Sequence, residues 1–248
     1  MKKINFLLIA ISALLTFSCK KKENTPDNTA TTNPTSTLNY YGLLYSKENA
    51  SVISGTLFAG SGSSTAYFPT GGFINTASIS EGWVGSAVNV GTISLNSVAF
   101  KSANQSGNIM YNDSTYSLFN SPLSWSVSGG NGISAFNYTY TATRPSYTGY
   151  NTLPDTIKLS QNKVMNFTGV TGADEIVISL LGGSGYLNKV ISGSSTSVTF
   201  TSGELSGLTP SSTSFMTITF NKSTIVNIGG KDFKFKTGYQ LFKQIVTQ

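Results

Sequence analysis

Lys231-Asp232-Phe233-Lys234-Phe235-Lys236 is the stretch of sequence that decides the fold. Its apolar and charged residues alternate with a period of two, which is the side-chain period of a β-strand. Phe233 and Phe235 would share one face of that strand, and Lys234 and Lys236 would share the other. We therefore expect a strand with its phenylalanines in a core and its lysines in solvent.

The same period of two recurs along most of the chain, with glycine, serine and asparagine between the apolar runs. Breakers such as Gly129-Gly130-Asn131-Gly132 stand where tight turns are needed. After residue 38 no helix longer than a turn or two is expected. The predicted fold class is all-β, built as one or two antiparallel β-sandwich domains. In the second half the expected strands include Glu175–Leu181, Ser214–Phe220, Thr224–Ile228, Lys231–Lys236 and Tyr239–Val246.

A domain boundary is expected at 144–154, where Pro145 and Pro154 bracket a short segment. This gives an N-terminal β-domain at 39–143 and a C-terminal β-sandwich at 155–248. One continuous sandwich made from both halves is the alternative.

Ala173-Asp174-Glu175-Ile176-Val177-Ile178-Ser179-Leu180 and Glu204-Leu205-Ser206-Gly207-Leu208 lie in the second half of the chain. These segments resemble the immunoglobulin-like and fibronectin-III-like modules of Bacteroidota surface lipoproteins. The resemblance covers at most the C-terminal half, and it implies an immunoglobulin-like sandwich there.

The start of the chain has the form of an export signal. Met1-Lys2-Lys3 precedes an uncharged, mostly apolar run from Ile4 to Ser18, which is too short for an ordinary membrane span. Cys19, the single cysteine, follows directly. Leu14-Leu15-Thr16-Phe17-Ser18-Cys19 resembles the relaxed lipobox of Bacteroidota lipoproteins. The resemblance implies a signal peptide at 1–18 and a lipidated Cys19 whose acyl chains anchor the protein in the membrane.

Residues 19–38 are predicted to be a disordered tether, because they carry almost no large apolar side chain. No aspartate follows Cys19, so retention in the inner membrane is not indicated. Lys22-Glu23 resembles signals that send some Bacteroidota lipoproteins to the cell surface. The expected location is the outer membrane, facing either the periplasm or the outside.

Composition removes several classes of function. The formal charge is +6, but the basic residues are scattered and match no nucleic-acid-binding module, so nucleic acid is not an expected partner. The chain has no histidine, and its one cysteine is assigned to the anchor. Zinc, Cys/His and Ser/His/Asp sites are therefore excluded, and neither a metal nor a cofactor is expected.

Carboxylates are the remaining route to catalysis. Most of the eight acids after the tether fall in expected turns or at strand ends. Ser160-Gln161-Asn162-Lys163 has the order of a penicillin-binding-protein motif, but it lies in an expected turn between two strands, where that chemistry needs a helix. No catalytic residue is predicted, and the protein is not expected to be an enzyme.

Aromatic residues suggest a binding function. Trp125 and the stripe Phe136, Tyr138, Tyr140 are expected in the core. Trp83, in Glu81-Gly82-Trp83-Val84-Gly85, either covers a core edge or stays exposed in a loop. Tyr147 and Tyr150 lie in the expected linker, and exposed rings there could stack on sugars. These three residues form the candidate glycan-binding site.

Asp113-Ser114-Thr115 and Asp155-Thr156-Ile157 match the pattern of Bacteroidota O-glycosylation, which makes Ser114 and Thr156 candidate acceptors. Ordinary turn residues are the alternative for both.

The leading hypothesis is a non-catalytic cell-envelope lipoprotein that serves as a structural, adhesive or assembly module. Its partners would be the membrane, through the lipid anchor, and an envelope protein or a polysaccharide. A glycan-binding surface lipoprotein is the second hypothesis, and an enzyme using dispersed carboxylates is the third.

Overall fold

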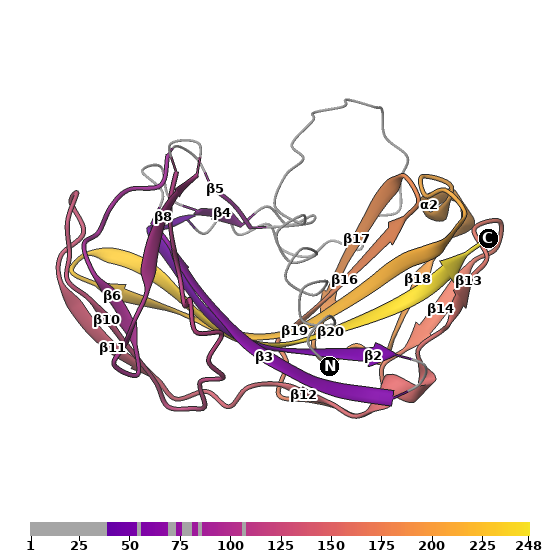
Figure 1. Cartoon of the computed structure of the whole chain (residues 1–248), viewed down its shortest axis with the longest axis horizontal. Coiled ribbons are helices and arrows are strands. Elements are labelled where there is room, and N and C mark those ends of the chain that lie inside the picture. The colour runs from indigo at the N-terminus through magenta and orange to yellow at the C-terminus, as the bar shows by residue number, and fades with distance from the viewer. Residues whose placement is uncertain (1–38, 54–55, 69–72, 76–80, 84–85, 106–107) are drawn as a thin grey trace. The chain divides into compact units, whose positions relative to one another are not determined.

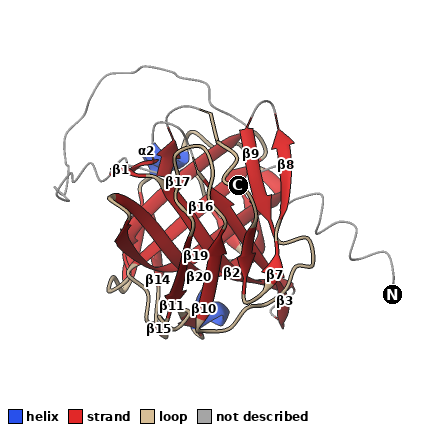
Figure 2. Ribbon diagram, turned by 90° about the vertical axis from the view of Figure 1, so that its left-hand side faces the viewer, coloured by secondary structure: helices blue, strands red, loops and turns tan. Residues whose placement is uncertain are grey.

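The computed structural model describes residues 39–53, 56–68, 73–75, 81–83, 86–105 and 108–248. Strands dominate this part of the chain (Figure 2). Its helical segments are the 3-10 turn η1 (Gly149–Thr152) and the single-turn helix α2 (Ser202–Leu205). The predicted all-β fold is confirmed, and the sheets are both mixed and antiparallel.

A nine-stranded sheet organises the molecule, and eight of its strands follow in the order β17-β16-β19-β20-β2-β3-β9-β8 (Figure 1). The ninth strand, β13, pairs with the end of β20. In chain order the nine strands are β2 (Gly42–Ile53), β3 (Thr56–Tyr67), β8 (Lys101–Gln105), β9 (Asn108–Asn112), β13 (Thr156–Ile157), β16 (Glu175–Gly182), β17 (Gly185–Ser192), β19 (Ser211–Ile228) and β20 (Lys231–Thr247).

Smaller sheets pack around the large one. Their orders are β1-β4-β5, β11-β10-β6-β7, β12-β15 and β14-β18. Their strands are β1 (Asn39–Tyr40), β4 (Phe73–Asn75), β5 (Glu81–Trp83), β6 (Ile93–Leu95), β7 (Val98–Ala99), β10 (Leu123–Val127), β11 (Phe136–Tyr140), β12 (Ser146–Tyr147), β14 (Lys163–Asn166), β15 (Val170–Thr171) and β18 (Ser197–Phe200).

The two longest strands are each longer than their sequence pattern predicts. Ser214–Phe220 and Thr224–Ile228 are both parts of β19, while Lys231–Lys236 and Tyr239–Val246 are both parts of β20. At about 3.4 Å per residue each of these strands spans nearly 60 Å. One antiparallel pair therefore carries two successive hydrophobic cores.

Gly238 lets β20 continue through the position where a break is expected. A Cβ atom there would lie 2.6 Å from the hydroxyl of Tyr45 and 3.1 Å from the carbonyl oxygen of Phe220. The missing side chain leaves room for the 2.8 Å hydrogen bond from the Tyr45 hydroxyl to Asn221 Oδ1. Glycine serves close packing here and does not end the strand.

The two larger cores lie on the same face of the nine-stranded sheet, and a small cluster of Tyr40 and Leu43, packed against Tyr45, Tyr67 and Ile225, lies on the opposite face. Phe233 and Phe235 of β20 enter one core, which the sheet β11-β10-β6-β7 covers. Tyr239 and Leu241 of the same strand enter the other, which β14, β18, β12 and α2 cover. Figure 1 shows β10 and β11 at one end of β19 and β20, and β14, β18 and α2 at the other. Trp125, 1% exposed, fills the first core as predicted.

The boundary expected at 144–154 does not divide the nine-stranded sheet. β2 pairs in parallel with β20 along 11 residue pairs, from Gly42↔Phe233 to Val52↔Lys243. The first half of the chain thus supplies a central strand to the second, and 34–248 forms one compact unit. The signal peptide and tether expected at 1–38 lie outside the described residues.

The expectation that Lys234 and Lys236 are solvated is wrong. They are only 7% and 8% exposed, although they do point away from Phe233 and Phe235. The ammonium of Lys234 lies 5.4 Å from the ring centroid of Tyr40, and that of Lys236 lies 5.2 Å from the ring of Tyr45. Cation–π contacts with neighbouring strands replace water around both lysines.

Candidate functional site

The face of the nine-stranded sheet that points away from both cores is called the second face below. Side chains alternate along each strand, so the residues that stand between core residues in the sequence point to this face. In β20 it carries Lys236, Gln240 and Phe242, between the core residues Phe235, Tyr239 and Leu241. Alternate residues of β17, β16, β19, β2 and β3 complete this face.

Exposed apolar side chains concentrate on the second face. Nine large apolar side chains of the described residues are more than a third exposed. Five of them are on this face: Ile53, Phe58, Tyr186, Val190 and Val246. Clustering of this kind marks interaction surfaces, since single exposed apolar residues are otherwise scattered.

Four rings form a row across the second face, here called the aromatic row: Tyr186, Phe215, Phe242 and Phe58. Tyr186 pairs with Leu181, which pairs with Phe215. The Phe215 and Phe242 rings have centroids 5.0 Å apart. Ser51 lies between Phe242 and Phe58 in the register. With neighbouring strands about 4.8 Å apart, the row extends about 24 Å from β17 to β3.

Hydroxyl and amide groups flank the aromatic row. Ser179 donates to Asn188 Oδ1 at 2.8 Å, and the Tyr186 hydroxyl lies 3.3 Å from Ser179 Oγ. Gln240 donates to Thr219 Oγ1 at 3.1 Å. The second face therefore offers hydrogen-bonding groups next to flat apolar rings.

Two lysines, Lys47 and Lys236, lie beside this polar grid and are called the lysine pair. Lys47 donates to Gln240 Oε1 at 2.6 Å. Gln240 is two residues before Phe242 in β20. Lys236 contacts Glu175 at 3.4 Å, and both ammonium groups face the ring of Tyr45. Burial, and then the like charge of Lys236, lower the pKa of Lys47 to about 8. The pair favours the approach of an anion.

The structure does not bring together the predicted glycan-binding residues. Trp83 ends β5 and pairs with Phe73 of β4, and its side chain lies outside the described residues. Tyr147 is 4% exposed, so the expectation that it is exposed is wrong. Its ring stacks on Phe220 at 4.7 Å between centroids, and its hydroxyl donates to the carbonyl of Gly149. Tyr150 is half-buried and packs against the same core.

The two candidate O-glycosylation residues are both exposed. Ser114 lies in a turn whose other residues bind Asp113, since Thr115 and Ser117 donate backbone N–H groups to its carboxylate at 2.9 and 2.7 Å. Thr156 lies in β13 beside the end of β20. Asp113 therefore has a structural role that needs no glycan.

Cys19, the candidate lipidation site, lies outside the described residues. Within the described ranges, no helix has the length and apolar character needed to cross a membrane. The described part of the chain also holds no cluster of three or more potential metal-ligating side chains of the His, Cys, Asp and Glu types.

The acidic side chains of the described residues make structural contacts. Glu48 pairs with Arg144 at 3.3 Å, Asp155 with Lys243 at 2.8 Å and Asp174 with Lys222 at 2.7 Å. Asp232 accepts from the amide of Asn227, and Glu175 accepts from Asn221. Asp113 closes its turn. With Glu204, described below, seven acids make such contacts, and none of these contacts joins two carboxylates.

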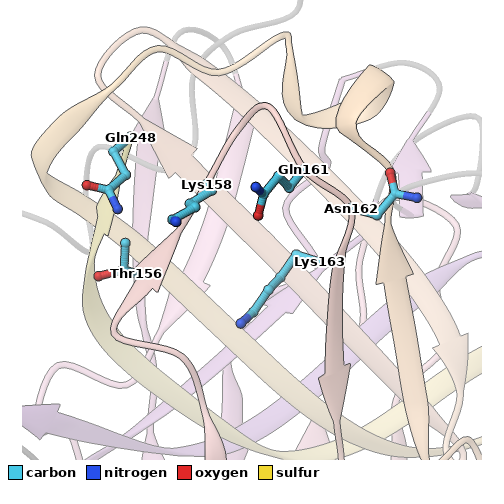
Figure 3. A pocket seen from close by; sticks show the side chains of 6 residues that line it. All are labelled: Thr156, Lys158, Gln161, Asn162, Lys163 and Gln248. Atoms are coloured by element: carbon cyan, nitrogen blue, oxygen red, sulfur yellow. The ribbon is translucent and has the colours of Figure 1, made fainter.

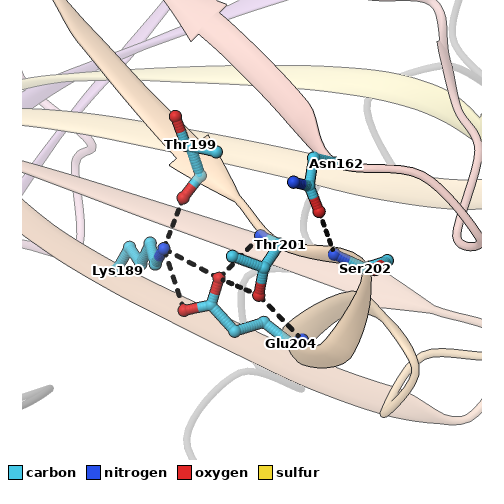
Figure 4. A network of polar contacts seen from close by, with 6 residues as sticks. All are labelled: Asn162, Lys189, Thr199, Thr201, Ser202 and Glu204. Carbon is cyan, nitrogen blue, oxygen red and sulfur yellow. Dashed lines mark hydrogen bonds and ion pairs between the residues drawn. The ribbon is translucent and has the colours of Figure 1, made fainter. Parts of the chain in front are cut away.

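Glu204 holds the short helix α2 in place (Figure 4). Thr201 accepts from the Glu204 backbone, and the Glu204 carboxylate accepts from the Thr201 backbone, which makes a capping box. Lys189 of β17 pairs with the same carboxylate at 2.8 Å. Burial raises the pKa of Glu204, but the hydrogen bonds from Lys189 and Thr201 outweigh burial, and the net pKa is lowered.

A surface pocket of about 350 Å³ lies beside the turn that follows β13 (Figure 3). Its lining is polar and comes from Thr156, Lys158, Gln161, Asn162, Lys163 and Gln248. Ser160 lies in the turn between β13 and β14, as the sequence predicts, and not on a helix. The pocket has no aromatic wall and contains no acid.

Sequence reasoning missed the second face. The alternation in β20 separates Phe242 and Gln240 from the core residues, but the parallel partner β2 joins them to Lys47 across 193 positions of sequence. No protein-family model, no curated protein and no solved structure matches this chain.

Proposed function

We propose that the protein is a non-catalytic cell-envelope lipoprotein, anchored to the outer membrane through Cys19, that acts as a structural, adhesive or assembly module. The observation that carries the proposal is the engagement of the described acids in ion pairs, a turn and a helix cap. A carboxylate used in this way serves structure, whereas catalysis needs a carboxylate tuned by burial and by a close partner.

Binding of a polysaccharide is the second candidate function. The aromatic row and the hydrogen-bonding groups beside it favour this candidate. Flat rings flanked by amides and hydroxyls suit a ligand that is apolar on one side and rich in hydroxyl groups at its edge.

Fatty-acid labelling of cells tests the anchor. Cells that make the protein are grown with a labelled fatty acid, and the protein is recovered from the membrane fraction. We expect label in the wild-type protein, and neither label nor membrane retention in Cys19→Ala. A Cys19→Ala protein that incorporates as much label as the wild type contradicts the proposal. Added protease on intact cells then decides which side of the outer membrane the protein faces.

A further inference from the structure

We infer that the second face of the nine-stranded sheet is a binding site for an acidic oligosaccharide, with sugar rings stacked on the aromatic row and an acid group attracted by the positive charge of the lysine pair. This inference deepens the second candidate function above. It places the site on residues other than Trp83, Tyr147 and Tyr150.

Exposure at the two ends of the aromatic row makes it available to a ligand. Tyr186 is 56% exposed on β17, and Phe58 is 51% exposed on β3. Phe215 and Phe242 are half-buried between them, with their rings tilted by 33°. A row about 24 Å long on a continuous sheet fits a chain of several sugars better than a single one.

The hydrogen-bonding groups beside the rings argue for a sugar chain and against a lipid surface. The groups of Asn188, Ser179, Thr219 and Gln240 border the row on the side of the lysine pair. Acyl chains can neither donate hydrogen bonds to these groups nor accept from them, so a lipid would gain nothing from this polar border. Sugar hydroxyls can both donate to them and accept from them.

The lysine pair selects for acid groups. Lys47 reaches the aromatic row through Gln240, and Lys236 adds a second positive charge beside the same Tyr45 ring. The carboxylate of Glu175 lies at this cluster, 3.4 Å from Lys236. An anion bound beside Gln240 would lie in the positive field of these two lysines.

Affinity electrophoresis of the intact protein tests the inference. The gels contain polygalacturonate, alginate or chondroitin sulfate, and methyl-esterified polygalacturonate serves as the uncharged counterpart of the first. We expect at least one acidic polymer to retard the protein. Tyr186→Ala and Phe58→Ala should each weaken that retention about ten-fold, a typical value for one stacked ring. Lys47→Met should reduce the preference for the charged polymer over its ester.

Matched variants control for general surface effects. Val164→Ala removes a 53% exposed side chain of β14, on a strand that covers the other face. Lys158→Met removes an exposed lysine of the polar pocket. Both variants should bind as the wild type does. Circular dichroism spectra like that of the wild type, and urea midpoints no lower than its midpoint, show that binding losses do not come from unfolding.

Three outcomes would overturn the inference. The first is no retardation by any of the three acidic polymers. The second is a loss of retention in Lys158→Met or Val164→Ala that equals the loss in Tyr186→Ala. The third is binding to phosphatidylglycerol vesicles, lost in Tyr186→Ala, without binding to a polymer, which would make the face a membrane surface. Fatty-acid labelling at Cys19 is read separately, so failure of this site and failure of the anchor are distinguishable.

Discussion

Lys47 shows how one residue on the second face couples charge to stability. Its pKa is about 8 in the folded protein, because it is buried and because Lys236 repels it. An unfolded lysine keeps a pKa near 10.5. Below pH 8 both states are protonated, and folding bears the full cost of the buried charge. Between pH 8 and 10.5 the unfolded chain binds more protons, so the free energy of unfolding should rise with pH.

Urea unfolding between pH 7.5 and 9.5 measures this effect. We expect the wild-type protein to gain about 2 kcal/mol over this range. Lys47→Met should be more stable at pH 7.5 and should lose the gain, while Lys158→Met should keep it. The range stops short of pH 10 because burial raises the pKa of Tyr67, Tyr111 and Tyr239, which reverses the trend at higher pH. A Lys47→Met protein with the wild-type slope would contradict the prediction.

At the scale of elements, α2 depends on its cap. A helix of four residues cannot form from its intrinsic propensity, so the capping box and the Lys189 ion pair must hold it. Thr201→Ala removes the hydroxyl that accepts from the Glu204 backbone. We expect a loss of about 1 kcal/mol in the free energy of unfolding, measured with urea.

Thr196→Ala, at an exposed bend before β18, is the matched control and should cost less. Glu204→Gln separates the two functions of Glu204, because an amide can still accept at the cap but cannot form the ion pair. Equal losses in Thr201→Ala and Thr196→Ala would show that the cap contributes nothing.

The period of two predicted which strand residues are buried wherever the decisive contacts are local. Trp125 and Phe136 are buried as their alternation indicates. Tyr147 is buried against that expectation, because Phe220, far along the chain, supplies a stacking surface that no local pattern reveals. Lys234 and Lys236 alternate as predicted, yet tyrosines from β1 and β2 cover them. The direction of a side chain could thus be predicted, and its surroundings could not.

At the scale of the whole molecule, the two halves of the chain should not fold separately. A fragment of residues 155–248 keeps β16, β17, β19 and β20 but loses β2, the partner of β20 on its other side. It also loses Ala50, Val52 and Tyr147 from the second core. We expect this fragment to show no cooperative urea transition, whereas 34–248 unfolds in one step.

Circular dichroism and amide proton dispersion provide the measurements for both polypeptides. A fragment of 155–248 that unfolds cooperatively at the wild-type midpoint would restore the two-domain organisation that the prolines at 145 and 154 suggest.

The pairing of β2 with β20 is the part of the fold that sequence periodicity could not reveal. Alternation shows which residues share a face, but not which distant strand lies alongside.

The parallel pairing of β2 with β20 also sets the order of events during biosynthesis. Residues near position 47 cannot pair until residues near position 240 have been synthesised, so the central sheet closes only after almost the whole chain has been made. Such distant pairing is slow, and a nascent chain lacking its final strand has no complete core to collapse around. The export proposed above would benefit from this delay, since a chain that crosses a membrane has to stay unfolded until translocation is nearly done.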